Sequence, residues 1–184
     1  MKMHLRHIAH VMLVALMVIG GNALAVDDPE NYRLSESALQ KYERATVAMY
    51  QFARSNPDSV QALKGSDEDD GDFNAMIRRM DQHAPGLRKA VEASGMKLEE
   101  YFVFALTLAG NAIGVAMFDQ FGGNEAELTD LQRANMNFVR SNMERITRFD
   151  ERMRAEYGDI MNAEEDEYAE EEASYYEDEE YGSE

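Results

Sequence analysis

Residues 101–118 have the sequence YFVFALTLAGNAIGVAMF, which contains no charged side chain. In a helical projection its apolar residues occupy nearly every side, and such a helix is typically buried all round. Several small residues would let neighbouring helices approach closely, namely Ala105, Ala109, Gly110, Ala112, Gly114 and Ala116. We therefore expect residues 97–121 to form a central helix that is buried on all sides.

Shorter helical patterns lie on both sides of this stretch. Ser35 is placed to cap a first helix that ends at Asn56-Pro57, and residues 58–64 can add two short turns. Pro85 divides residues 73–94 into two segments, and Asp72 is placed to cap the first of them. Because no alternating apolar pattern is long enough for a sheet, the sequence predicts an all-α fold with four to five helices in residues 35–158.

The last helix is expected to begin at Thr129 and Gln132, which have the spacing of a capping box, and to run to about residue 157. Its apolar and basic residues separate onto opposite arcs. The apolar arc contains Leu131, Phe138, Ile146, Phe149 and Met153, and the basic arc contains Arg133, Arg140, Arg145, Arg148 and Arg152.

The first 25 residues have the three parts of an export signal. Lys2 and Arg6 give a positive start, residues 8–19 are mainly apolar, and residues 23–25, ALA, match the small-x-small pattern at a cleavage site. We expect this signal to be removed, which places the mature protein in the periplasm or outside the cell. Residues 26–34 contain few apolar side chains and predict a flexible leader.

The charge is concentrated at the C-terminal end. The formal net charge is -18, and residues 159–184 hold 13 of the 36 acidic residues without a Lys or Arg. Such a composition predicts a disordered extension. The overall charge opposes binding to nucleic acid or to an anionic bilayer, and it favours a basic protein or cations as partners.

Cofactor and metal motifs are weak. The chain has no Cys, and His83 is the only histidine that follows the signal. The acidic residues Glu68, Asp69, Asp70 and Asp72 are candidates for weak cation binding, because calcium prefers oxygen ligands. If Gly71 is taken as the conserved glycine at position 6 of an EF-hand loop, position 12 is Ile77, where a Glu should bind the calcium. The loop therefore does not match an EF-hand. We expect no cofactor.

The sequence favours a non-enzymatic protein. It lacks a Gly-x-Ser-x-Gly turn for a serine nucleophile, although a hydrolase built on converging carboxylates stays open as a third hypothesis. The second hypothesis is a membrane-associated structural protein that inserts residues 101–118. Gly110 and Gly114 have the spacing of self-associating transmembrane helices, but the flanks are acidic.

Two segments carry a resemblance to known proteins. Residues 95–101, GMKLEEY, and residues 135–139, NMNFV, are similar to an uncharacterised group of small exported all-helical bacterial proteins, over roughly residues 87–146. The resemblance implies export and a helical fold, and it supplies no functional residues.

The preferred hypothesis is binding through the acidic extension. Its tyrosines add rings that can contact cations and arginine side chains. The candidate partner-binding residues are Glu164, Glu165, Asp166, Tyr168, Tyr175, Tyr176 and Tyr181. An alternative within the same chain is that the extension folds back over the basic arc of the last helix.

Overall fold

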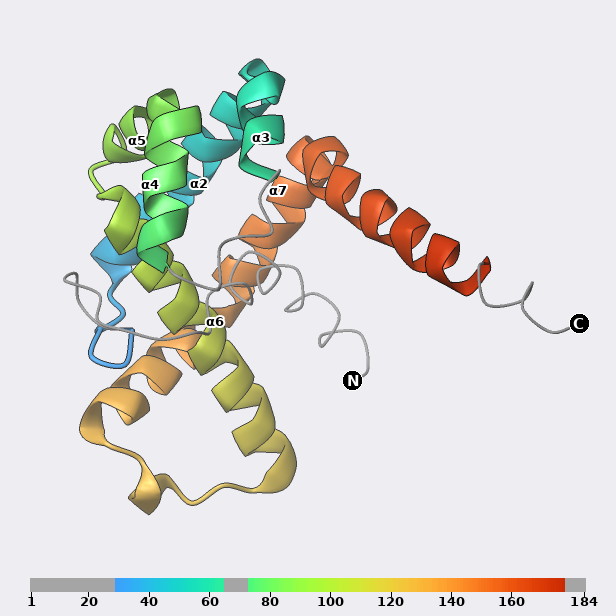
Figure 1. Cartoon of the computed structure of the whole chain (residues 1–184). Coiled ribbons are helices and arrows are strands. Elements are labelled where there is room, and N and C mark those ends of the chain that lie inside the picture. The colour runs from blue at the N-terminus through green and yellow to red at the C-terminus, as the bar shows by residue number, and fades with distance from the viewer. Residues whose placement is uncertain (1–28, 65–72, 178–184) are drawn as a thin grey trace, which may run out of the picture.

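The computed structural model describes the backbone of residues 29–64 and 73–177, with most side chains of these ranges as far as Ile160 (Figure 1). This part of the chain contains no strand, so the expected all-α class is confirmed. Its elements are α2 (Glu36–Ser55), α3 (Pro57–Lys64), α4 (Phe73–His83), α5 (Pro85–Glu92), α6 (Leu98–Phe121), the short 3-10 helix η1 (Glu125–Glu127) and α7 (Asp130–Glu177).

The helix boundaries follow from local sequence signals. The Ser35 hydroxyl accepts a hydrogen bond from the Ala38 backbone N–H at 3.2 Å and caps α2. Thr129 and Gln132 form the expected capping box before α7, with distances of 3.2 Å and 2.9 Å. Gly122 ends α6 in a left-handed conformation with φ 71°, which favours glycine. The expected cap at position 72 lies outside the described residues.

The core forms where α2 crosses the first half of α6. The Tyr42 ring stacks on Tyr101 with centroids 5.0 Å apart, and its centroid lies 4.9 Å from that of Phe104. From α4, the ring of Phe73 meets Phe102 edge to face. Large aromatic side chains contribute most of the apolar area removed from water in such a core. The buried side chains of this core also include Leu39, Ala45, Val91, Leu98 and Val139.

The second half of α6 departs from the expectation. Residues 101–105 are buried, but beyond Ala109 only Val115 is buried, while Met117 and Phe121 are 56% and 73% exposed. Figure 1 shows the physical reason: of the described helices, α2, α4 and α5 cover only the first half of α6, and α7 lies beside the rest. The prediction of burial on all sides is therefore correct for the first half of α6 and wrong for the second.

The segment before α2 is also better fixed than expected. The Asn135 side chain accepts a hydrogen bond from the Leu34 N–H and donates one to the Tyr32 carbonyl, each at 2.9 Å. The Thr107 hydroxyl lies 3.1 Å from the Pro29 carbonyl oxygen. Residues 29–34 are thus held against α6 and α7 and do not form the flexible leader that the composition predicts. Residues 1–28, which include the expected signal, lie outside the described residues.

Helix α7 contains one break. Tyr157 has φ -127° and ψ 16°, which are not helical values, and two helices meet there. Figure 1 shows that the second part of α7 leaves the body at a sharp angle to the first. The boundary expected near residue 158 therefore falls at a real break. Beyond it the acidic extension lies apart from the packed body, with a helical backbone to Glu177, and this is consistent with the C-terminal extension that the composition predicts to be disordered.

Candidate binding surfaces

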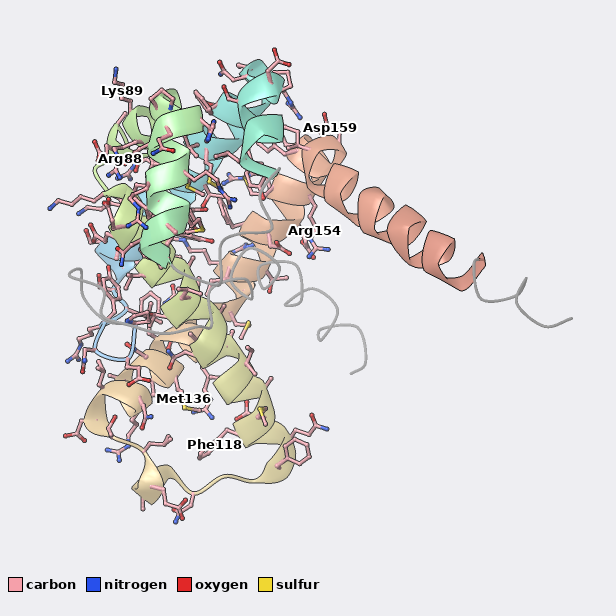
Figure 2. The ribbon with its side chains drawn as sticks, in the orientation of Figure 1. Arg88, Lys89, Phe118, Met136, Arg154 and Asp159 are labelled. Atoms are coloured by element: carbon pink, nitrogen blue, oxygen red, sulfur yellow. The ribbon has the colours of Figure 1, made fainter. Side chains whose placement is uncertain are left out.

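The root of the acidic extension is fixed by side chains from α2. The Tyr157 ring is 1% exposed and stacks on Tyr50, with centroids 5.4 Å apart. The Arg54 guanidinium carbon lies 4.5 Å from the centre of the Tyr157 ring. Arg54 also pairs with the Asp159 carboxylate at 3.0 Å and donates to the Glu156 carbonyl (Asp159 is labelled in Figure 2). These contacts set the point and the direction at which the extension leaves the body.

The candidate residues of the extension follow this root. Six of them, namely Glu164, Glu165, Asp166, Tyr168, Tyr175 and Tyr176, lie in the helical backbone of α7 after its break, where side chains are not described. Tyr181 lies outside the described residues. The helical backbone extends away from the body, so it does not fold back over the arginines of the first part of α7 (Figure 1).

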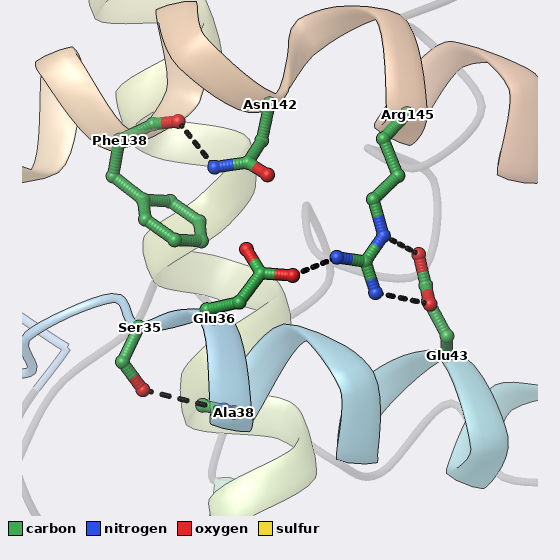
Figure 3. Close-up of polar contacts among 7 residues, drawn as sticks. All are labelled: Ser35, Glu36, Ala38, Glu43, Phe138, Asn142 and Arg145. Atoms are coloured by element: carbon green, nitrogen blue, oxygen red, sulfur yellow. Dashed lines mark hydrogen bonds and ion pairs between the residues drawn. The ribbon is translucent and has the colours of Figure 1, made fainter.

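Those arginines already have acidic or aromatic neighbours on the body. Figure 3 shows Arg145 between two carboxylates of α2, with Glu43 bound at 2.9 Å and 2.8 Å and Glu36 also paired. Arg140 pairs with Asp119 at 2.7 Å. The basic arc that the amphipathic pattern predicts therefore supplies ion pairs that hold α7 to α2 and α6. Charge-assisted bidentate pairs such as Arg145–Glu43 are the stronger kind.

The acidic candidates for cation binding, Glu68, Asp69, Asp70 and Asp72, lie outside the described residues. Within the described ranges there is no group of three or more His, Asp or Glu side chains arranged to hold a metal ion. His83 lies exposed at the end of α4.

One arginine joins titratable groups from three helices of the body. Arg88 binds Asp81 at 2.7 Å and 2.9 Å and Glu99 at 2.7 Å, so it links α4, α5 and α6. Its hydrogen bond lowers the pKa of Glu99, which is the opposite of what a general acid requires. Arg88 thus has a structural role, because its ion pairs hold α4 and α6 to α5.

A buried hydroxyl cluster lies between α2 and α6. The Thr46 hydroxyl is 3.2 Å from the Tyr101 hydroxyl and 2.9 Å from the Tyr42 carbonyl oxygen. Burial raises the pKa of Tyr101 well above 10.0 and also raises the pKa of Tyr42. Both phenols are therefore neutral at physiological pH, and the cluster satisfies buried polar groups within the core.

Comparison with protein-family models, with curated proteins and with solved structures found no match to this chain.

Sequence reasoning missed two features of these surfaces. The first is the anchor made by Arg54 and Tyr157, which lie 103 positions apart and carry no local motif. The second is the exposed end of α6, where Met117 and Phe121 lie within an apolar sequence that predicts burial. A helical projection of 101–121 gives the residues that share this face, but only the placement of neighbouring helices shows that the face is open.

Proposed function

We propose that this protein is an exported, non-enzymatic binding protein that presents its acidic, tyrosine-containing extension to a basic protein partner. The observation that carries the proposal is the root of the extension. Arg54 and Tyr50 hold Tyr157 at a break in α7, and the backbone beyond it leaves the body (Figure 1). Beyond Asp159, whose carboxylate pairs with Arg54, an extension held in this way offers its charge to a partner.

Charge supports a basic partner over other macromolecules. Residues 159–184 contain 13 acidic side chains and no basic one, whereas residues 26–158 carry 23 acidic and 16 basic residues. Dense like charge raises the association rate with an opposite charge and repels nucleic acid and anionic lipid. Divalent cations are the second class of ligand that this charge would attract, through the extension and through Glu68, Asp69, Asp70 and Asp72.

Binding of polylysine to the purified protein tests the proposal. A chain that ends at Ile160 keeps the anchor and loses the extension, so we expect its thermal unfolding to be unchanged and its affinity to fall at least tenfold. Affinity of the intact chain should also fall steeply between 50 mM and 500 mM salt, because salt screens exposed charges.

Matched charge variants separate the extension from the general charge of the surface. The triple variant Glu164→Gln, Glu165→Gln, Asp166→Asn removes three charges from the extension. Its control, Glu127→Gln, Glu144→Gln, Glu151→Gln, removes three from exposed positions of the body. Equal loss of polylysine affinity in both, or undiminished binding by the truncated chain, would reject the proposal. Calcium titration of the same variants tests the cation alternative.

The second candidate is a membrane-associated role through insertion of 101–118. One observation favours it: within the described residues, Leu98–Phe121 is long and apolar enough to cross a bilayer. In an apolar 18-residue stretch of this helix, 44% of the residues are buried, so more than half of them are not covered by the rest of the protein. The packing of Tyr101 and Phe104 on Tyr42 speaks against insertion, because the core would have to open first. A requirement for detergent to release the protein from membranes would favour insertion over the binding role.

A further inference from the structure

The break in α7 at Tyr157 does not come from a proline or from a glycine that the backbone requires. Sharp kinks in helices arise at proline, at paired small residues or where a side chain disturbs the hydrogen-bond ladder. Residues 130–177 contain no proline. Gly158 does not have a left-handed φ, and a Cβ atom added to it would meet no atom of the described residues within 4 Å. An isolated glycine is tolerated inside a helix, so the cause of the break lies in tertiary contacts.

The contacts of Tyr157 with α2 account for the break. Its φ of -127° differs by about 64° from the helical value of about -63°. Rotation about this bond turns the Cβ atom relative to the preceding helix, so a straight α7 would direct the Tyr157 ring away from its place against Tyr50. In that place the ring is 1% exposed and stacks on Tyr50. The buried ring and the broken helix are therefore parts of one arrangement.

Arg54 holds this arrangement through three contacts. Its guanidinium carbon lies 4.5 Å from the centre of the Tyr157 ring, and its Nη2 atom pairs with the Asp159 carboxylate at 3.0 Å. The same nitrogen donates to the Glu156 carbonyl. In a continuous helix that carbonyl accepts from the backbone N–H four residues later, so Arg54 binds a group that would otherwise close the helix across the break.

We propose that Arg54 is a latch that keeps α7 bent at Tyr157, and that a polycation which takes the Asp159 carboxylate from Arg54 lets α7 straighten. In the straight state the acidic extension continues along the axis of α7 instead of leaving the body at an angle. The release of the latch by a partner rests on the proposed function and adds to it, because binding of a basic partner then changes the direction of the extension.

The ion pair of the latch is open to exchange. The side chains of Arg54 and Asp159 are 45% and 69% exposed, and exposed ion pairs contribute little to stability. Asp159 is also the first of the 13 acidic residues in 159–184, so a polycation on the extension brings positive groups next to it. The polycation gains this carboxylate only when Arg54 gives it up. This difference between the bent and straight states couples binding to straightening.

The distance between two spin labels tests the latch without any partner. The chain has no Cys, so Ser141→Cys and Ala169→Cys give one label before the break and one after it. In a continuous helix these two positions would be separated by about 42 Å at 1.5 Å per residue. A right-angle bend at Tyr157 would reduce this distance to about 30 Å. We expect the parent to give a single distance that is clearly shorter than that of a continuous helix.

Matched substitutions decide the role of Arg54. Arg54→Gln removes the latch, whereas Arg148→Gln removes the same charge from an exposed side chain that pairs with Glu144 of its own helix. We expect the first variant to move the label distance towards about 42 Å, and the second to leave it as in the parent. Tyr157→Ala removes the buried ring and should act like the first. Equal distances in the two arginine variants, a parent that is already straight, or a broad spread of distances in the parent would overturn the latch.

Polylysine tests the release of the latch. Its addition to the labelled parent should move the distance towards about 42 Å. By linkage, Arg54→Gln should bind polylysine roughly threefold or more tightly than Arg148→Gln does. Polylysine that binds without changing the distance would reject the coupling and leave the proposed function standing. Absence of binding would reject the proposed function together with the release, whereas the label distances of the Arg54 variant decide the latch in either case.

Discussion

Replacement of Asn135 by alanine should destabilise the protein, because this side chain joins α7 to the segment before α2. The side chain is 4% exposed and serves two backbone groups of the segment before α2, the Leu34 N–H and the Tyr32 carbonyl, both at 2.9 Å. Asn135→Ala leaves this donor and this acceptor without a partner in a place from which water is largely excluded. Each buried unpaired group costs about 1–3 kcal/mol.

The expected loss in the free energy of unfolding is about 3 kcal/mol. The lower part of the possible range applies because residues 29–34 lie near the surface and can shift toward water, and because alanine favours the helix by about 0.5 kcal/mol over asparagine. For a domain of this size, 1 kcal/mol corresponds to roughly 4 °C in Tm, so we expect Tm to fall by about 12 °C. Urea unfolding followed by circular dichroism gives the free energy directly.

Asn142, which lies in the same helix α7, provides a matched control. Asn142 donates to the Phe138 carbonyl of its own helix at 3.0 Å and is only half-buried (Figure 3). Asn142→Ala makes the same chemical change with the same gain in helix propensity, yet it unpairs no group outside α7. We expect it to change the stability by less than about 0.5 kcal/mol. If the two variants differ by less than this amount, the argument that Asn135 fixes the leader is refuted.

Three further predictions concern the body. Gly86→Ala should destabilise the protein by about 1–3 kcal/mol in urea, because its Cβ would lie 2.6 Å from the Phe52 ring, and unchanged stability would show that the ring moves aside freely. The pKa of Tyr101 is raised by burial in the folded state, so its contribution to stability is fully present below pH 10 and is lost as the pH rises beyond that value. The absorbance of the Tyr101 tyrosinate can be isolated by comparing the parent with Tyr101→Phe. This absorbance should appear only as the helical signal in circular dichroism is lost. Ionisation of Tyr101 while the protein stays folded would contradict the raised pKa. Glu43→Gln should cost about 1 kcal/mol and Glu36→Gln less, because the Glu43 carboxylate is 18% exposed and that of Glu36 is 53% exposed; equal costs would show that bidentate geometry is irrelevant here.

The sequence by itself determined the local elements of this protein. Hydrophobic periodicity and caps such as Ser35 and the Thr129–Gln132 box act between residues a few positions apart, so they place the helices and the all-α class correctly. The composition change after residue 158 likewise marks where the packed body ends, because dense like charge cannot form a core.

Only the tertiary structure decided which faces are covered. Residues 101–118 are apolar throughout, yet the first half is buried and the second is open, because the short helices α4 and α5 reach only the first half (Figure 1). The contacts of Asn135 with residues 32–34 and of Arg54 with Tyr157 join positions about 100 apart. Such contacts arise when helices pack and carry no local sequence signal. The fixed segment before α2, the root of the extension and the exposed second half of α6 therefore become visible only in three dimensions.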